Sequence, residues 1–105
     1  MTEFIQVFIT INEKAKAREI AETLLEKKLA ACVQISGPLT SLYKWEGRLI
    51  EDQEWLLIIK SSKDHYSELE KQVRQIHVYE VPEILALSIS DGNKAYLNWL
   101  EKELK

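Results

Sequence analysis

One histidine, one tyrosine and two glutamates lie close together in the stretch HVYEVPEI, which starts at His77. If this stretch is extended, His77, Tyr79 and Glu83 share one side, and Glu80 points to the other. An imidazole beside a carboxylate can bind a divalent cation or shuttle a proton, because imidazole changes charge near neutral pH and carboxylate oxygens are hard ligands. The alternative interpretation is structural: His77 ends a helix, the proline shapes a turn and the glutamates are solvated.

Two further positions hold side chains that could bind a ligand. Cys32, in the apolar run AACV, is either a small buried side chain or a soft ligand for copper or zinc, with His77 or His65 brought near by folding. Lys60 closes an apolar run, and it is either an ordinary lysine at a strand edge or a partner for the glutamates or an anion. The sequence has no CxxC or HxxxH pair, so the signal for a local metal site is weak.

Aromatic side chains gather on both sides of a polar segment. Tyr43 and Trp45 precede Glu46, and Trp55 follows the segment. These rings form either an aromatic-lined cleft or ordinary cross-strand packing. The histidine and tyrosine of HVYEVPEI could also serve an enzyme as acid and base, but no nucleophile or electrophile is evident. We therefore expect no catalysis.

The first half of the chain is predicted to form strands around one helix. Alternation over residues 4–11 predicts a strand with two partly apolar faces, and Asn12 is expected to cap a helix that runs to about residue 28. A strand at 30–35 is expected to break at Gly37-Pro38 in a loop or bulge. Two long antiparallel strands then fill residues 39–61, joined through the polar segment that contains Gly47.

The second half of the chain is predicted to form a helix, a strand and a final helix. A helix is expected to start at Ser62 or Asp64 and to stop near His77. A strand follows at 83–90, then a turn with a cap, then a final helix with Tyr96, Leu97 and Leu100 facing inward. The order β-α-β-β-α-β with a C-terminal helix predicts an α+β, ferredoxin-like sandwich, formed as a single domain by residues 1–105.

This arrangement leaves a surplus of apolar surface. The run from Trp55 to Ile59 has apolar side chains on both faces, as does the strand at 4–11. A continuously hydrophobic strand is normally buried on both sides, yet two helices cover only one face of the sheet. We therefore expect the second face to be covered by other copies of the chain in a homo-oligomer.

Composition excludes several classes of partner. The net charge of -3 and the mixing of Lys with Glu argue against a broad nucleic-acid surface. The chain has no apolar run long enough to span a bilayer, and its first residues lack the basic region of a signal peptide. A single cysteine cannot form an intramolecular disulfide, which fits a reducing compartment. We expect a soluble, cytoplasmic protein.

Five separated motifs occur in order along the chain: LAACV, SLYKWEG, EWLLIIKS, HVYEVPEI and YLNWL. Together they resemble the CutA family, the divalent-cation tolerance proteins, nearly end to end. The resemblance implies a ferredoxin-like subunit assembled as a homotrimer, whose strands join between subunits and whose terminal helix takes part in assembly. The family's recurrent motif is His-Pro-Tyr-Glu-Val-Pro-Glu, and Val78 stands here in place of its first proline.

The resemblance also implies a ligand class and a site. It favours a non-enzymatic homotrimer that binds divalent metals, with Cu2+ first and Zn2+ next, through His77, Glu83 and Cys32. A second interpretation is a signalling scaffold of PII-like architecture that binds a small anionic ligand or a protein tail in the same cleft. The recurrent family residues expected around clefts between subunits are Tyr43, Trp45, Glu46, Lys60, Tyr79, Glu80 and Trp99.

Overall fold

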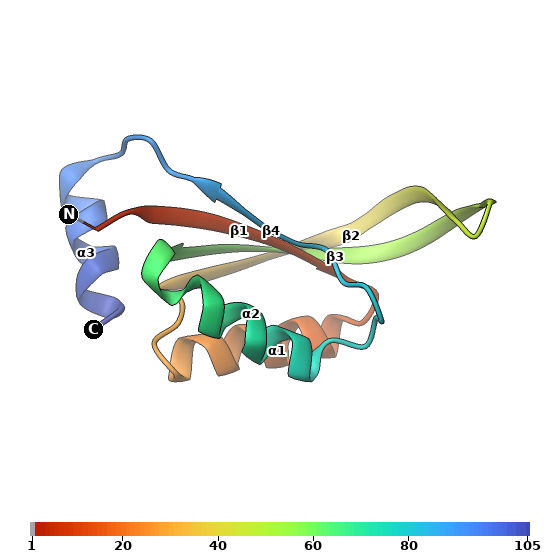
Figure 1. The fold of residues 1–105 in the computed structure, drawn as a ribbon, viewed down its shortest axis with the longest axis horizontal. Coiled ribbons are helices and arrows are strands. Elements are labelled where there is room, and N and C mark those ends of the chain that lie inside the picture. Colours follow the sequence, from red (N-terminus) through yellow and green to blue (C-terminus); the bar gives the residue numbers. More distant parts are fainter. Residues whose placement is uncertain (1) are drawn as a thin grey trace.

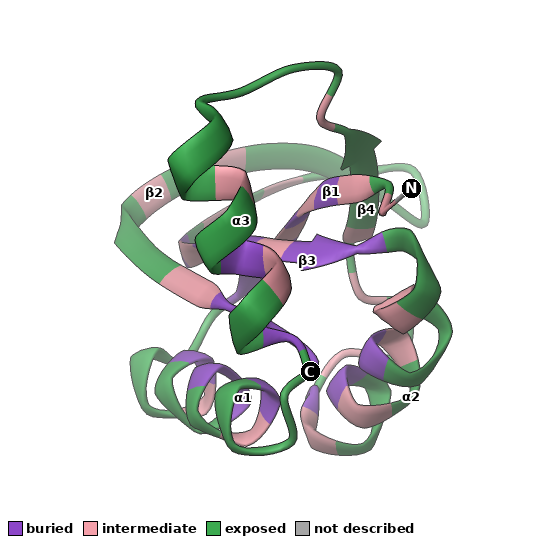
Figure 2. Cartoon of the chain, turned by 90° about the vertical axis from the view of Figure 1, so that its left-hand side faces the viewer, coloured by how far each residue is buried: buried purple, intermediate pink, exposed green. Residues whose placement is uncertain are grey.

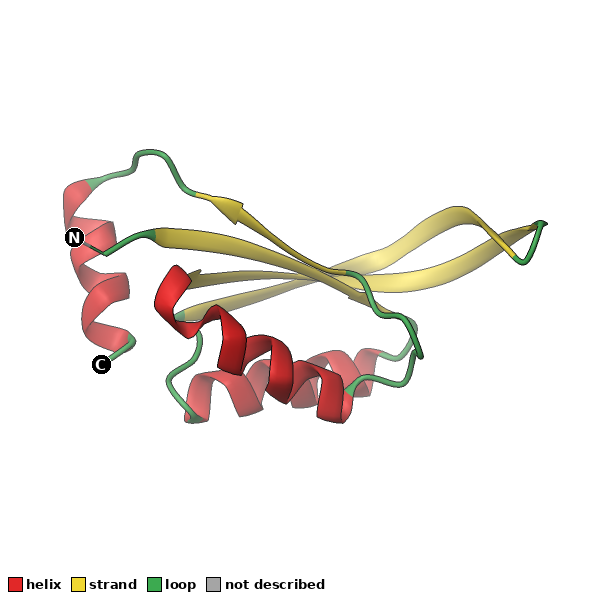
Figure 3. Cartoon of the chain, in the orientation of Figure 1, coloured by secondary structure: helices red, strands yellow, loops and turns green. Residues whose placement is uncertain are grey.

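In the computed structural model, which describes residues 2–105, strands and helices follow the predicted α+β order. The elements are β1 (Phe4–Ile11), α1 (Lys14–Glu26), β2 (Cys32–Trp45), β3 (Arg48–Ser62), a 3-10 turn (Lys63–His65), α2 (Tyr66–Ile76), β4 (Ile84–Ser88) and α3 (Lys94–Glu103). The strands form one antiparallel sheet in the order β2-β3-β1-β4 (Figures 1 and 3). None of the helices described within residues 2–105 is both long and apolar enough to cross a membrane.

The core lies between one face of the sheet and the two helices α1 and α2. The alternation of β1 places four side chains on that face, each at most 5% exposed: Ile5, Val7, Ile9 and Ile11. Ile20 and Leu24 of α1 and Leu69 and Val73 of α2 pack against them. Figure 2 shows the buried sides of both helices turned toward the sheet. Each such side chain stabilises the fold by roughly 1.5–3 kcal/mol, so this layer fixes β1 and the residues at its end.

Strand β2 confirms that a bulge lies at Gly37-Pro38 and corrects the expectation that the strand breaks there. Gly37-Pro38 does not end a strand: β2 continues to Trp45, and its pairing with β3 shifts register between Ser36 and Leu39. The disturbance is a bulge, because β3 runs unbroken beside it and keeps both parts of β2 paired. Gly37 has a φ of 153°, and a Cβ there would lie 2.7 Å from the Trp55 ring. Glycine is therefore the residue that fits at this position.

The hairpin of β2 and β3 projects beyond the helices as a long arm (Figure 1). Its turn is only Glu46 and Gly47, which have φ values of 52° and 79°. Positive φ values at both residues are typical of the two-residue hairpin turns whose backbone twist matches that of the flanking strands. Trp45 therefore pairs directly with Arg48, and the polar residues after the turn belong to β3. Several side chains near the end of this arm are more than half exposed, including Leu42 and Leu49.

Helix ends agree with the sequence in part: a 3-10 turn follows Ser62, and α2 itself begins only at Tyr66. His77 caps α2, and its backbone N–H donates to the Val73 carbonyl at 2.8 Å. The Asn93 side chain caps α3 by accepting from the Tyr96 N–H at 3.0 Å. The expected cap at Asn12 is wrong, because α1 begins after Glu13 and has no side-chain cap. Since β1 extends through Ile11, only a short connection is left before the helix.

The final strand and helix differ in detail from the prediction. Strand β4 covers Ile84–Ser88, which is shorter than the expected 83–90. In α3, Leu100 is fully buried and Leu97 half-buried, as expected, whereas Tyr96 is 42% exposed. The prediction that Tyr96 faces inward is therefore wrong for a single chain, because Tyr96 lies on the side of α3 that points away from the core.

The sheet face opposite α1 and α2 carries a row of apolar side chains, which we call the open sheet face. It comprises Phe8, Leu56, Ile58, Leu85 and Leu87, which the strand register places on one side. Leu85 is 55% exposed and Leu87 48% exposed. In one chain, α3 lies only at the end of the sheet far from the hairpin tip (Figure 1). The surplus apolar surface expected from the sequence is therefore present.

Candidate functional site

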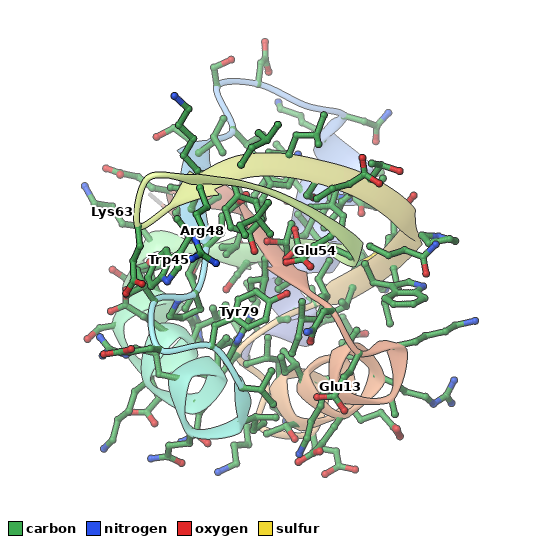
Figure 4. The ribbon with its side chains drawn as sticks, turned by 90° about the vertical axis from the view of Figure 1, so that its right-hand side faces the viewer. Glu13, Trp45, Arg48, Glu54, Lys63 and Tyr79 are labelled. Carbon is green, nitrogen blue, oxygen red and sulfur yellow. The ribbon has the colours of Figure 1, made fainter. Side chains whose placement is uncertain are left out.

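A cleft of about 630 Å³ lies between the β2-β3 hairpin and the segment that links α2 to β4 (Figure 4). Strand pairing supplies one wall, because Tyr43 faces Ile50 across the hairpin. The linking segment supplies the other wall, and the end of β1 lies between them. The lining residues are Thr10, Ser41, Leu42, Tyr43, Trp45, Ile50, Glu54, Tyr79, Glu80, Val81 and Glu83. Three glutamates and three aromatic side chains thus face one space.

Tyr79 and Glu54 join the two walls. The Tyr79 hydroxyl donates to Glu54 Oε2 at 2.7 Å, and Glu54 is only 6% exposed (Figure 4). Burial raises the pKa of Tyr79 well above its usual value, and the bond to the carboxylate raises it further. Because the phenol stays protonated at neutral pH, Tyr79 is a hydrogen-bond donor here and not a general base.

The other hydroxyls with described partners in this region also donate to carboxylates. The Tyr43 hydroxyl donates to Asp52, and this bond raises the pKa of Tyr43. Thr10 Oγ1 donates to Glu83 Oε1 at 3.5 Å. The protons of these groups are already engaged, so the cleft presents mainly carboxylate oxygens to a ligand.

His77 is held by hydrogen bonds through both ring nitrogens. Nε2 lies 2.8 Å from the Thr10 carbonyl, and Nδ1 lies 3.1 Å from the backbone N of Tyr79. A carbonyl can only accept, so Nε2 carries the proton, and Nδ1 accepts from the Tyr79 N–H. The ring also packs edge-on against Tyr79, with centroids 4.7 Å apart. His77 therefore ties the end of α2 to β1 and orients Tyr79, and it could ligate an ion only by giving up one of these bonds.

Cys32 and Lys60 lie away from the cleft in one chain. The register aligns Cys32 with Lys60 and Lys60 with Gln6. Thr10 is four residues further along β1, or about 13 Å at the usual rise of a strand. Lys60 Nζ donates to Gln34 at 2.6 Å and is not among the residues that line the cleft. Cys32 and His77 are therefore not brought together within one chain.

Trp99 and Glu46 also lie outside the cleft. Trp99 is on α3, where its ring lies 5.7 Å from that of Tyr96. Figure 1 places α3 and the hairpin tip at opposite ends of the molecule. Glu46 is exposed in the turn. Of the ten predicted site residues, five line the cleft: Tyr43, Trp45, Tyr79, Glu80 and Glu83.

Sequence reasoning missed Glu54, Asp52 and Thr10. Glu54 stands at the start of the apolar run EWLLIIKS, and a charged side chain entering a buried strand is a signal that it has a partner. The pairing of Tyr43 with Asp52 depends on the turn position, which the sequence left open. Within residues 2–105, no group of three or more His, Cys, Asp or Glu side chains is arranged to hold a metal ion.

Comparison with known proteins gives one consistent result. The family model described as CutA1 divalent ion tolerance protein matches residues 5–103. The divalent-cation tolerance protein CutA of Thermus thermophilus is 47% identical over 96 residues, which cover 91% of this chain and 93% of the relative.

Solved structures agree with the sequence match. CutA1 from Oryza sativa has a TM-score of 0.93 and 40% identity, over 96% of this chain and 93% of its own. CutA from Archaeoglobus fulgidus, described as a periplasmic divalent cation tolerance protein, has a TM-score of 0.91 and 37% identity over 100% of both chains. The sequence match and the fold thus agree, and the chain belongs to the CutA1 divalent ion tolerance family.

Proposed function

We propose that this protein binds divalent cations as a homotrimer and catalyses no reaction, with Cu2+ the first candidate and Zn2+ the second. The observation that carries the proposal is the charge of the cleft. Three glutamates line it, and no lysine, arginine or histidine occurs among its described lining residues. Carboxylate oxygens gathered in one space favour cations, and the names of the relatives link the family to divalent cations.

Glu83 and Glu54 are the proposed ligands within the chain. Glu83 accepts from the Thr10 hydroxyl, and Glu54, which is almost buried, accepts from the Tyr79 hydroxyl. His77 joins them only if an ion displaces one of its two ring hydrogen bonds. Cys32 joins them only if a neighbouring subunit brings its own copy to the cleft, because in one chain the two are far apart. Ligands from a second subunit or from water complete the coordination.

Self-association is supported by the open sheet face, and the family resemblance adds the number three. Contiguous apolar surface on a soluble chain is typical of an interface, and closed rings of identical subunits are the usual way to bury it. A cytoplasmic location fits the single cysteine, although the Archaeoglobus relative is described as periplasmic.

Calorimetric titration with Cu2+ and Zn2+ tests the proposed site. Wild type should give a saturable isotherm, and Glu83→Gln should weaken binding by about ten-fold or more, since it replaces a charged ligand by a neutral one. Glu26→Gln is the matched control, because Glu26 is an exposed glutamate at the end of α1, outside the cleft. The proposal fails if wild type gives no saturable heat, and Glu83 is not a ligand if its variant matches wild type.

The alternative of a scaffold for a small anion is opposed by the same charge. An anion in the cleft would meet Glu54, Glu80 and Glu83, whereas Lys60, which motivated the alternative, lies elsewhere and bonds to Gln34. Anionic metabolites and nucleotides should therefore leave the thermal midpoint unchanged, because a ligand raises stability only if it binds the native state.

A further inference from the structure

The cleft is much larger than a metal ion requires. Its volume is about 630 Å³, whereas a water molecule occupies about 30 Å³ of the liquid. Clefts that hold small organic molecules in proteins range from roughly 300 to 1,000 Å³. The space between the hairpin and the linking segment therefore has room for a whole organic ligand beside its carboxylates.

The walls of the cleft carry aromatic and apolar side chains that can contact an organic ligand. Tyr43 and Trp45 contribute rings from the hairpin, and Tyr79 contributes one from the linking segment. Trp45 is 49% exposed and Val81 is 69% exposed, so both retain apolar surface that a ligand could cover. A hydrated metal ion gains little from such walls. Aromatic faces attract organic cations, because the ring quadrupole is negative above the ring plane.

The hydrogen-bonding groups select the polarity of the ligand. The hydroxyls of Tyr43, Tyr79 and Thr10 all donate to carboxylates. Both phenols keep their protons at neutral pH, and their hydroxyl donors are occupied by the carboxylates of Asp52 and Glu54. A complementary ligand must therefore bring its own N–H donors and a positive charge, and an anion finds neither charge nor free donors among these groups.

We propose that this cleft binds a small primary amine, with its ammonium group at Glu54 and Glu83 and its alkyl stem against Trp45 and Val81. This goes beyond the binding of divalent metals, which needs only the carboxylates. Both functions use the carboxylates of Glu54 and Glu83, but only the amine also needs the apolar wall at Trp45 and Val81, so amine binding can be lost while metal binding stays.

Titration with n-butylammonium, followed by two-dimensional NMR of the full chain, tests the inference. Saturable shifts are expected at the residues that line the cleft. Tetramethylammonium, which has no N–H donor, should bind more weakly, and butyrate should produce no saturable shift. Glu54→Gln should weaken amine binding by about ten-fold, because a charge-assisted hydrogen bond is lost. Trp45→Ala should weaken it by about two- to five-fold, which is roughly the loss expected when one methylene of the alkyl stem is no longer buried against the ring.

Leu49→Ala is the matched control for Trp45→Ala. Leu49 is 71% exposed near the same end of the hairpin but does not line the cleft, so its variant should bind the amine as wild type does. The inference is overturned if wild type shows no saturable shift, or if butyrate binds as well as the amine. It is also overturned if Trp45→Ala leaves amine binding unchanged. The Cu2+ isotherm of Trp45→Ala should match that of wild type, so loss of amine binding alone separates this site from the metal function.

Discussion

His77 holds two parts of the fold together through its ring. Its Nε2–H bonds to the Thr10 carbonyl, and its Nδ1 accepts from Tyr79. The sequence drew attention to this residue because histidine beside glutamate is a common metal ligand. Residue types alone could not distinguish metal binding from the observed hydrogen bond, because the partner of the His77 ring is the backbone carbonyl of Thr10, which is far away in the sequence. The structure therefore supports the structural interpretation that the sequence had left open.

Replacing His77 by alanine should destabilise the protein. The change leaves the Thr10 carbonyl and the Tyr79 N–H without their partners at a site where the side chain is only 9% exposed. We expect a loss of about 2–3 kcal/mol in the free energy of unfolding, measured by urea denaturation. Val78→Ala is the control, since Val78 is 47% exposed beside it. Equal stabilities of the two variants would contradict the role given to His77.

Tyr79 should make stability depend on alkaline pH. Its pKa is raised in the folded protein, so its contribution is fully present below the unfolded value near 10 and is lost as pH rises toward the higher folded value. The stability gap between wild type and Tyr79→Phe should therefore narrow above pH 10. Urea denaturation at pH 8 and pH 10.5 measures the gap. A gap that stays constant between these pH values would refute the assignment to this phenol.

The β2-β3 hairpin is the element that the sequence described least accurately. Periodicity predicted β1 with its true bounds and the end of α2, because those elements depend on local pattern. It split β2 at Gly37-Pro38, because glycine and proline usually end a strand. Whether a strand survives such a pair depends on its neighbour, and here β3 supplies continuous pairing. The register of this hairpin also determines that Tyr43 lies beside Asp52. Because the sequence left the position of the turn open, this contact could not be predicted.

Gly37→Ala should disturb the bulge and with it the arm. A Cβ at this position would lie 2.7 Å from the Trp55 ring and 3.1 Å from the Glu54 carbonyl. Overpacking of this kind, combined with an unfavourable φ, should cost about 1–3 kcal/mol in the free energy of unfolding. Gly92→Ala is the control, because its nearest neighbour is the flexible end of Leu97 at 3.3 Å. Denaturation curves that rank Gly92→Ala as the more damaging change would contradict this account.

At the scale of the whole molecule, the open sheet face is the feature that one chain does not explain. Side chains on both sides of β1 and β3 are apolar, and only one side is covered by α1 and α2. The sequence predicts this surplus without help from the family resemblance, because it depends on composition and strand count and not on exact register. The number of copies does not follow from the chain itself. Three copies are the expectation that the family resemblance adds.

Sedimentation equilibrium at micromolar concentration should give a mass three times that of one 12.2 kDa chain. Leu85→Lys should shift the protein toward monomer, because it places a charge on the apolar surface that the assembly is expected to bury. Leu25→Lys is the matched control: Leu25 is 42% exposed on α1, on the side of the molecule away from the open sheet face. A wild-type protein that sediments with the mass of a single chain would contradict the proposed trimer. If both variants dissociate equally, general destabilisation and not the open sheet face is the cause, since only one of the two charges lies on the proposed interface.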